Sequence, residues 1–240
     1  MSVKTPARAR RVAHTSDSTQ AFSPAEGAVA QVAAPSAVAD LHRVPYPIVE
    51  HFYTVQGEGA WTGRAAYFIR TAGCDVGCPW CDTKESWEES AHPHLTVGEL
   101  LAHVREAGAE TVVITGGEPT MHDLGPLTRV LQDAGLECHL ETSGAYPITG
   151  TFDWVTLSPK KYKPPHPSVY PLANDLKIVV VNKSDFRWAE QHAALCPDGT
   201  KLWLQPEWGQ QRRLPLIIEY VKTHPKWRIS LQTHKYLEIP

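Results

Sequence analysis

The stretch GCDVGCPWCDT, at residues 73–83, places three cysteines, Cys74, Cys78 and Cys81, at a C-x3-C-x2-C spacing. Thiolates are soft, charged ligands of iron–sulfur clusters, and a cubane cluster held entirely by protein needs four of them. Three thiolates leave one iron free to bind a small molecule and to pass it an electron. The spacing therefore predicts a [4Fe–4S] cluster with one open iron.

Two other interpretations of the three cysteines are a structural zinc site completed by a histidine and a disulfide with one spare thiol. A zinc knuckle normally carries a second ligand pair at short spacing, and the sequence has none. Cys138 and Cys196 are isolated in apolar segments, where a free cysteine usually packs as a small hydrophobic residue. With five cysteines and no signal peptide, a secreted disulfide scaffold is also disfavoured.

The composition is that of a globular enzyme with one core. The chain has 240 residues, 42% of them hydrophobic, and a formal net charge of -3. This charge gives no electrostatic footprint for nucleic acid, and no apolar run is long enough to span a bilayer. We expect a soluble protein in the cytoplasm, where a reducing environment protects thiolates.

Residues 1–42 differ in composition from the rest of the chain. They are rich in Ala, Ser, Thr and Pro and contain one aromatic residue, Phe22. Such a segment buries too little apolar surface to offset the entropy of ordering. The basic run Arg8–Arg11 suggests a targeting element, but no apolar segment follows it. We therefore predict a disordered extension at 1–42 and a folded domain at 43–240.

From about residue 46, short apolar runs alternate with amphipathic segments, and a capping box of Thr96 and Glu99 marks one helix start. This alternation predicts a parallel sheet covered by helices. About six such units are too few for a complete eight-stranded barrel. The predicted fold class is α/β, an open, partial (β/α)6 TIM-like barrel. The predicted strands are 65–70, 111–115, 136–141, 154–157, 176–181, 202–204 and 227–231, and the predicted helices are 96–107, 124–134, 184–195 and 214–224.

Unusual residues follow several of these strands, at the edge where parallel α/β sheets bind ligands. Gly116 and Gly117 allow close approach of the backbone, and Glu118 can accept hydrogen bonds from an amino group. Taken alone, the two glycines also fit an ordinary tight turn. Lys177 interrupts an apolar strand, so we expect it to face a cleft or a carboxylate. Polar runs after other predicted strands are 141–144, 158–160 and 205–208.

Together with TGGEP at 115–119, the cysteine motif resembles the radical S-adenosylmethionine (SAM) superfamily. The segments FYTVQGEG at 52–59, CDT at 81–83 and QTHKYLEIP at 232–240 resemble the 7-carboxy-7-deazaguanine synthase family within it. The resemblance covers roughly residues 46–240. It implies a radical ring contraction of 6-carboxy-5,6,7,8-tetrahydropterin to 7-carboxy-7-deazaguanine with loss of ammonia, SAM being regenerated.

The resemblance also implies roles for individual residues. Cys74, Cys78 and Cys81 would hold the cluster, and Thr83 would bind Mg2+, although Thr83 could instead cap a turn. Residues implied to bind SAM are Trp80, Cys81, Asp82, Gly117, Ser158, Pro159, Lys160, Gln205, Pro206, Glu207 and Trp208. Residues implied to bind the pterin are Val55, Gln56, Gly57, Arg70, Thr115 and Pro240.

Arg70 has independent support, because a guanidinium pairs bidentately with a carboxylate such as that of the pterin. Its alternative is a surface salt bridge at a strand end. The resemblance further implies a flavodoxin or ferredoxin as electron donor and a homodimer. Competing functions are an activase that installs a glycyl radical on a protein, and a zinc-stapled binding module.

Overall fold

A computed structural model describes residues 40–240 of the chain. The predicted disordered extension lies outside these residues except for its last three positions. Leu41 packs against the hydrophobic core, and the carbonyl of His42 accepts a hydrogen bond of 2.9 Å from the Gly98 N–H. Contacts of the folded part therefore begin before the predicted boundary at residue 43.

One open sheet of nine strands organises the described residues, in the order β3-β1-β2-β4-β5-β6-β7-β8-β9. β1 pairs antiparallel with β2 and β3, whereas every pairing from β2 through β4 to β9 is parallel. A parallel run that does not close on itself is the predicted partial barrel. The strands are β1 (Pro45–Val55), β2 (Ala65–Thr71), β3 (His94–Thr96), β4 (Thr111–Gly116), β5 (Glu137–Thr142), β6 (Trp154–Leu157), β7 (Asp175–Val180), β8 (Lys201–Pro206) and β9 (Trp227–Ile229).

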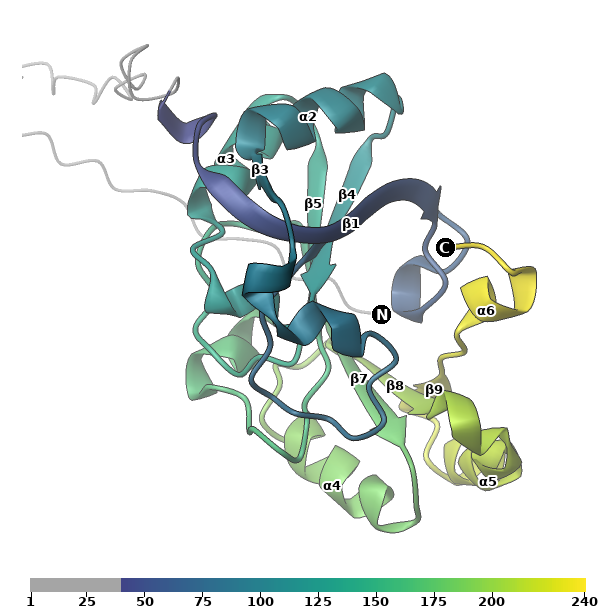
Figure 1. Ribbon diagram of the computed structural model, residues 1–240. Coiled ribbons are helices and arrows are strands. Elements are labelled where there is room, and N and C mark those ends of the chain that lie inside the picture. Colours follow the sequence, from purple (N-terminus) through teal and green to yellow (C-terminus); the bar gives the residue numbers. More distant parts are fainter. Residues whose placement is uncertain (1–39) are drawn as a thin grey trace, which may run out of the picture. The chain divides into compact units, whose positions relative to one another are not determined.

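Helices pack on the outer face of this sheet (Figure 1). One hydrophobic cluster lies beneath α2 and α3, and a second lies beneath α4 and α5. Their strand residues alternate along the chain, as in Cys138 and Leu140 of β5. The α-helices are α2 (Val97–Glu106), α3 (Gly125–Asp133), α4 (Ser184–Ala193), α5 (Leu214–Thr223) and α6 (Thr233–Leu237), and the 3-10 helices are η1 (Gly59–Trp61), η2 (Lys84–Trp87), η3 (Glu89–Ala91), η4 (Pro119–Met121), η5 (Pro167–Leu172) and η6 (Trp208–Arg213).

The other face of the sheet carries polar and aromatic residues, because successive strand residues point to opposite faces. On β5 these inward residues are Glu137, His139 and Glu141. On β7 the inward residues include Lys177, which lies in the middle of the strand and is buried. The period of two thus separates an apolar outer surface under the helices from a functional interior.

The predicted strands and helices agree with the structure to within two residues at either end. The capping box is confirmed: Glu99 accepts from the Thr96 N–H at 2.8 Å, and the Thr96 hydroxyl accepts from the Glu99 N–H at 3.3 Å. The sequence analysis did not predict β1, β3 or α6. β1 starts in a proline-rich run that pairs only with the short edge strand β3, so its first residues carry a weak strand signal.

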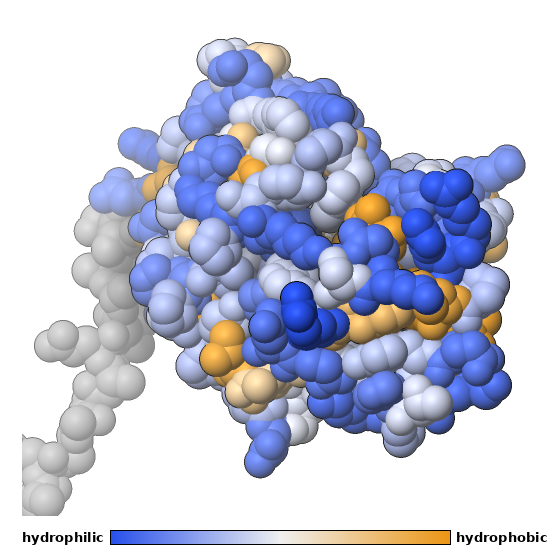
Figure 2. All heavy atoms as spheres, turned by 90° about the horizontal axis from the view of Figure 1, so that it is seen from below, coloured by the Kyte–Doolittle hydropathy of each residue, from blue (hydrophilic) through white to orange (hydrophobic). Residues whose placement is uncertain are grey.

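Across residues 40–240, none of the helices has the length and apolarity that a membrane crossing requires. The face of the molecule in Figure 2 is mostly hydrophilic, with hydrophobic side chains confined to smaller areas.

Candidate active site

A cavity of about 640 Å³ lies at the carboxyl ends of the parallel strands. Every residue that the sequence analysis assigned to the site lines it except Pro159, which lines a neighbouring hollow of about 120 Å³. Segments far apart in the sequence therefore meet around one space. The assigned residues that line the cavity are Val55, Gln56, Gly57, Arg70, Cys74, Cys78, Trp80, Cys81, Asp82, Thr83, Thr115, Gly117, Ser158, Lys160, Gln205, Pro206, Glu207, Trp208 and Pro240.

The three cysteines lie on the loop between β2 and η2, and all three are free thiols facing the cavity. The loop is fixed at its start, where the Gly73 N–H donates to Ser86 O at 2.8 Å. Burial raises the pKa of the Cys78 thiol to about 11, although Lys160 opposes the shift, and burial also raises the pKa of Cys74. Metal binding at these thiols must therefore release protons.

The two glycines after β4 have a structural reason to be glycine. A Cβ on Gly117 would lie 2.5 Å from Gly73 O and 2.7 Å from the Cys74 Cβ. A Cβ on Gly116 would lie 2.4 Å from the Thr71 Oγ1. The glycines thus let the end of β4 pack against the end of β2 and against the start of the cysteine loop.

Glu118 does not serve the ligand-binding role suggested from the sequence. Its carboxylate is fully buried, lies outside the cavity lining, and accepts hydrogen bonds from three residues. The donors are the backbone N–H and hydroxyl of Thr120, the Thr142 hydroxyl, and the backbone N–H and hydroxyl of Ser143. This carboxylate joins the ends of β4 and β5 instead of contacting a small molecule.

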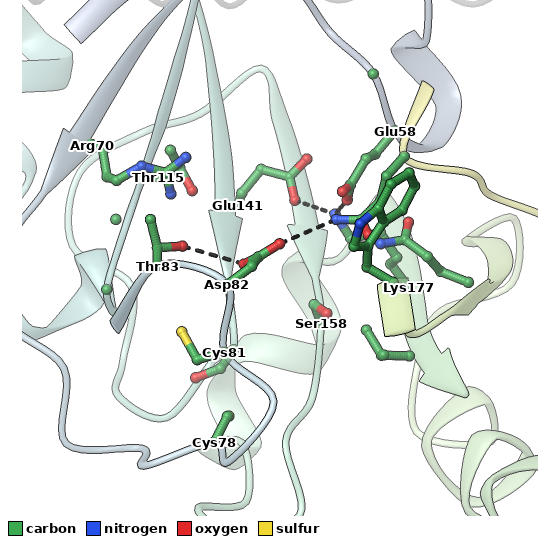
Figure 3. A pocket seen from close by; sticks show the side chains of 18 of the residues that line it. Glu58, Arg70, Cys78, Cys81, Asp82, Thr83, Thr115, Glu141, Ser158 and Lys177 are labelled. Carbon is green, nitrogen blue, oxygen red and sulfur yellow. Dashed lines mark hydrogen bonds and ion pairs between the residues drawn. The ribbon is translucent and has the colours of Figure 1, made fainter. Parts of the chain in front are cut away.

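Lys177 projects from β7 into the cavity between two carboxylates (Figure 3). Its Nζ lies 2.5 Å from the Glu58 Oε2 and 2.6 Å from the Glu141 Oε2, and its side chain is only 7% exposed. Gln56 extends the network by donating to the Glu141 Oε1 at 3.3 Å and accepting from the Glu58 N–H at 3.0 Å. The expectation that Lys177 faces a cleft or a carboxylate is confirmed, and Lys177 does both.

The protonation of this network follows from burial and charge. Burial alone would lower the pKa of Lys177, but Glu141 and Glu58 raise it above its ordinary value. Burial would raise the pKa of Glu58, yet Lys177 lowers it, whereas the pKa of Glu141 is raised by burial with Glu58 adding to the shift. The network therefore favours a protonated Lys177 and an ionised Glu58, whereas Glu141 protonates more readily than an ordinary glutamate.

A second lysine of the cavity, the half-buried Lys160, lies near the cysteines. Its Nζ donates to the Ser158 carbonyl at 2.5 Å and to the Ser158 Oγ at 2.7 Å, and it lies 5.9 Å from the ring centroid of Trp80. Burial lowers the pKa of Lys160, although the nearby Cys78 opposes the shift. The ammonium places a positive charge beside the thiols, where the negative charge of a ligated thiolate would need it.

Asp82 and Thr83 follow the last cysteine and face the same space (Figure 3). The Thr83 hydroxyl donates to the Asp82 Oδ1 at 3.3 Å. Thr83 occupies the N-cap position of η2, but its side chain makes no capping hydrogen bond. The turn-capping alternative for Thr83 therefore lacks the contact that it requires.

Arg70 and Thr115 are neighbours in the parallel register of β2 and β4, and both line the cavity. The Nε of Arg70 donates to the Glu50 Oε1 at 2.7 Å. The salt-bridge alternative for Arg70 is confirmed, and Arg70 also faces the cavity, so its pairing with a substrate carboxylate stays a prediction. Its fork of five donors leaves the terminal nitrogens available for a carboxylate.

The segment after β9 brings Pro240 and three further lining residues to the cavity, Gln232, His234 and Lys235. Apart from Pro240, the sequence analysis assigned them no role, although they belong to a motif that it used. Nor did it assign Glu58, Glu141 or Lys177 to the site. The lysine within an apolar strand was the one available signal for that network.

The donor set fits an iron–sulfur cluster. Three thiols face one cavity, with a lysine close to them. Within the part of the chain that the structure describes, no three His, Cys, Asp or Glu side chains are spaced to hold a single metal ion. A cubane needs a wider spacing, because each of its thiolates binds a different iron.

The partial barrel and the cavity with three cysteines define a radical SAM protein. In agreement, the family model of the Radical SAM superfamily matches residues 68–158. This superfamily implies a [4Fe–4S] cluster and SAM as cofactors.

Similar proteins of known family identify one family within the radical SAM superfamily. A 7-carboxy-7-deazaguanine synthase of Synechocystis is 54% identical over 202 residues, covering 84% of this chain and 97% of that protein. The synthase of Escherichia coli K12 is 38% identical over 221 residues, covering 81% and 99%. A crystal structure of QueE from Escherichia coli matches with a TM-score of 0.73 and 34% identity, over 82% of this chain and 99% of that one. The chain belongs to the 7-carboxy-7-deazaguanine synthase family, which favours a synthase over the activase and the zinc module considered from the sequence.

Proposed function

We propose that the protein converts 6-carboxy-5,6,7,8-tetrahydropterin into 7-carboxy-7-deazaguanine and ammonia, with SAM as a regenerated cofactor. The observation that supports this reaction is the convergence of the residues implied to bind the cluster, SAM and the pterin on one cavity of about 640 Å³. A cavity of this size is ample for two small molecules side by side. The names of the relatives supply the product.

The cysteine side of the cavity would hold the cofactors. Cys74, Cys78 and Cys81 would ligate the cluster, which together with SAM supplies a carbon-centred radical when bound. Lys160 would balance the charge of the ligated thiolates. The lining residues that would hold SAM are Trp80, Asp82, Gly117, Ser158, Lys160, Gln205, Pro206, Glu207 and Trp208, with Pro159 in the adjoining hollow.

The β1–β2 side would hold the pterin. The guanidinium of Arg70 would pair with the pterin carboxylate, and Thr115 beside it would add a hydroxyl contact. Pro240 lies near Thr54, whose hydroxyl donates to the Pro240 O at 3.4 Å, and the proline would contact the guanidine-like edge of the pterin. Val55, Gln56 and Gly57 would complete this side.

The decisive experiment is anaerobic reconstitution with iron and sulfide, followed by incubation with SAM, a chemical reductant and 6-carboxytetrahydropterin. We expect mass spectrometry to find 7-carboxy-7-deazaguanine, one equivalent of ammonia per product, and little net consumption of SAM. A protein that consumes SAM without forming a deazapurine would contradict the proposal.

Mg2+ at Thr83 is a further part of the proposal. Its hydroxyl faces the cavity without capping η2, and Mg2+ commonly keeps waters and takes ligands from the substrate. We expect chelation of Mg2+ to reduce turnover, and Thr83→Val to reduce the dependence on added Mg2+. Full activity of the chelated enzyme would exclude the ion. An electron donor such as flavodoxin or ferredoxin and a homodimeric assembly also stay predictions.

A further inference from the structure

The C-terminal strap, which we define as residues 232–240, borders the cavity with little apolar burial, its one contact between aromatic rings among the described residues being that of Tyr236 with Trp208. Its helix α6 contains no buried residue, and Tyr236 and Leu237 are 58% and 61% exposed. Yet four residues of this strap line the cavity. A segment held by few apolar contacts opens at low free energy, so the polar contacts of the strap decide its position.

One set of polar contacts joins the strap to the proposed pterin side. The backbone N–H and the hydroxyl of Thr233 donate to Gly57 O at 3.0 Å and 2.9 Å. A Cβ on Gly57 would lie 2.2 Å from the His234 Nδ1, so the glycine permits this close packing. The strap is thus seated on a segment that the proposed function assigns to the pterin.

Three strap residues contact the proposed SAM side, and Lys235 is the one that contacts both Asp82 and Trp208, since Tyr236 packs edge-on against Trp208 alone, with ring centroids 5.2 Å apart. The Lys235 Nζ lies 2.6 Å from the Asp82 Oδ2 and 5.1 Å from the ring centroid of Trp208. Gln232 adds a longer contact of 3.4 Å to the same carboxylate oxygen. Asp82 belongs to the cysteine loop and Trp208 to η6, and both are proposed SAM contacts.

The strap therefore contacts both proposed subsites. SAM and the pterin would each contact residues that hold the strap. The molecule that binds first therefore orders the strap. The second molecule then meets a strap that is already in place, and its binding carries less of the ordering cost. When two ligands share a conformational element in this way, they bind cooperatively although neither contacts the residues that bind the other.

We propose that Lys235 is a positioning residue that couples SAM binding to pterin binding by holding the C-terminal strap closed over the cavity. This inference rests on the proposed function, because that function assigns the two sides of the cavity. Lys235 acts through Asp82 and Trp208 and contacts neither reacting molecule in this scheme. Coupled closure would keep SAM unreacted until its substrate is bound.

Titration calorimetry on the anaerobically reconstituted protein tests the coupling, with the cluster left oxidised so that no turnover occurs. In the wild type, we expect saturating SAM to tighten the binding of 6-carboxytetrahydropterin about 10-fold. Lys235→Met should reduce this factor to about 2 or less, whereas Lys235→Arg should keep most of it, since arginine retains both the ion pair and the aromatic contact. Lys222→Met, at an exposed α5 ion pair that does not line the cavity, is the matched control.

Hydrogen exchange gives a second readout that needs no pterin. In the SAM-bound wild type, the amides of residues 233–239 should exchange more slowly than in the SAM-free protein, and Lys235→Met should remove the difference. Equal coupling in wild type and Lys235→Met, or no coupling in the wild type, would overturn the role of Lys235 while leaving the proposed function intact. A wild type that binds SAM but not the pterin would overturn the proposed function and this inference with it.

Discussion

The amino and carboxyl ends of the barrel interior are built from the same strands but differ in their side chains. Aromatic rings pack at the amino end, and a buried lysine pairs with carboxylates toward the carboxyl end. At the amino end, His139 of β5 packs with Trp61 and Trp154, with ring centroids 5.2 Å and 6.4 Å away. At the carboxyl end of the same strand, Glu141 faces the cavity and pairs with Lys177. Only Leu140 lies between Glu141 of the ionic network and His139, which forms an aromatic plug with Trp61 and Trp154.

The polar groups at the two ends also differ in how they are satisfied. In the plug, the indole nitrogens of Trp61 and Trp154 are buried without a hydrogen-bond partner among residues 40–240. In the cavity, Lys177 is paired with two carboxylates. An unpaired indole costs little compared with an unpaired charge, and the one ionisable ring of the plug, His139, is paired with Glu137 at 2.9 Å. The cavity must balance its charges even before ligands arrive.

The largest effect that separates the two ends should come from cysteine substitutions. Cys78→Ala removes a thiol at the cavity, whereas Cys138→Ala removes a fully buried thiol of β5 on the helix side. Loss of groups that only orient metal ligands costs about 10–100-fold, so loss of a ligand should exceed this range in turnover. Iron content and the absorbance near 400 nm should fall with it.

Cys138→Ala is the matched control, and it should keep its iron while losing about 1 kcal/mol of stability through a small cavity. Equal iron content in both variants would show that the open end does not bind the cluster.

An intermediate effect should come from Lys177. Lys177→Met leaves Glu58 and Glu141 buried without their cation, and breaking a buried ion pair from one side costs about 3 kcal/mol or more. For a domain of this size, Tm should fall by about 6–12 °C, measured by scanning calorimetry. Lys222→Met should shift Tm by about 2 °C or less, because exposed ion pairs stabilise little. Similar shifts in the two variants would mean that the cavity charges are as well solvated as surface ones.

The smallest effect concerns the plug and depends on pH. Burial lowers the pKa of His139 from its ordinary value of 6.5, although Glu137 opposes the shift. The unfolded chain therefore binds a proton at a higher pH than the folded protein, so stability is complete above about pH 6.5 and falls as the pH drops through that value. His139→Gln should flatten the dependence by at most about 1.4 kcal/mol per pH unit, measured by urea unfolding between about pH 7.5 and about pH 5.5.

Other buried histidines, such as His192, contribute to the same slope, so only the difference between wild type and His139→Gln is informative. Identical slopes of stability against pH in the two proteins would show that another group, and not His139, takes up the proton.

The parallel sheet was predictable from the sequence because each strand repeats the same short-range pattern. The apolar run of 111–115 and the capping box at Thr96 each report local physics, and each lies where it was expected. β1 was not predicted, since its antiparallel pairing with β2 depends on contacts between separate segments.

The functional site likewise has features that local sequence predicts and features that depend on long-range contacts. The cysteine spacing and the strand ends are local, and the cavity forms around them. The pairing of Lys177 with Glu58 joins residues 119 positions apart, and the contact of Lys235 with Asp82 joins residues 153 positions apart. No window of sequence contains both members of such a pair, so only the folded chain shows what each lysine holds.

The saturated carboxylate of Glu118 has a consequence for how mutational scans of this protein should be interpreted. Two acceptor oxygens serve five donors from η4 and the end of β5, and glutamine would turn one acceptor into a clashing amide. Position 118 should therefore be as intolerant of replacement as a residue that touches the substrate. Loss of function on replacement of Glu118 would report its structural role at this strand end. Contact with a ligand has to be established by a separate measurement.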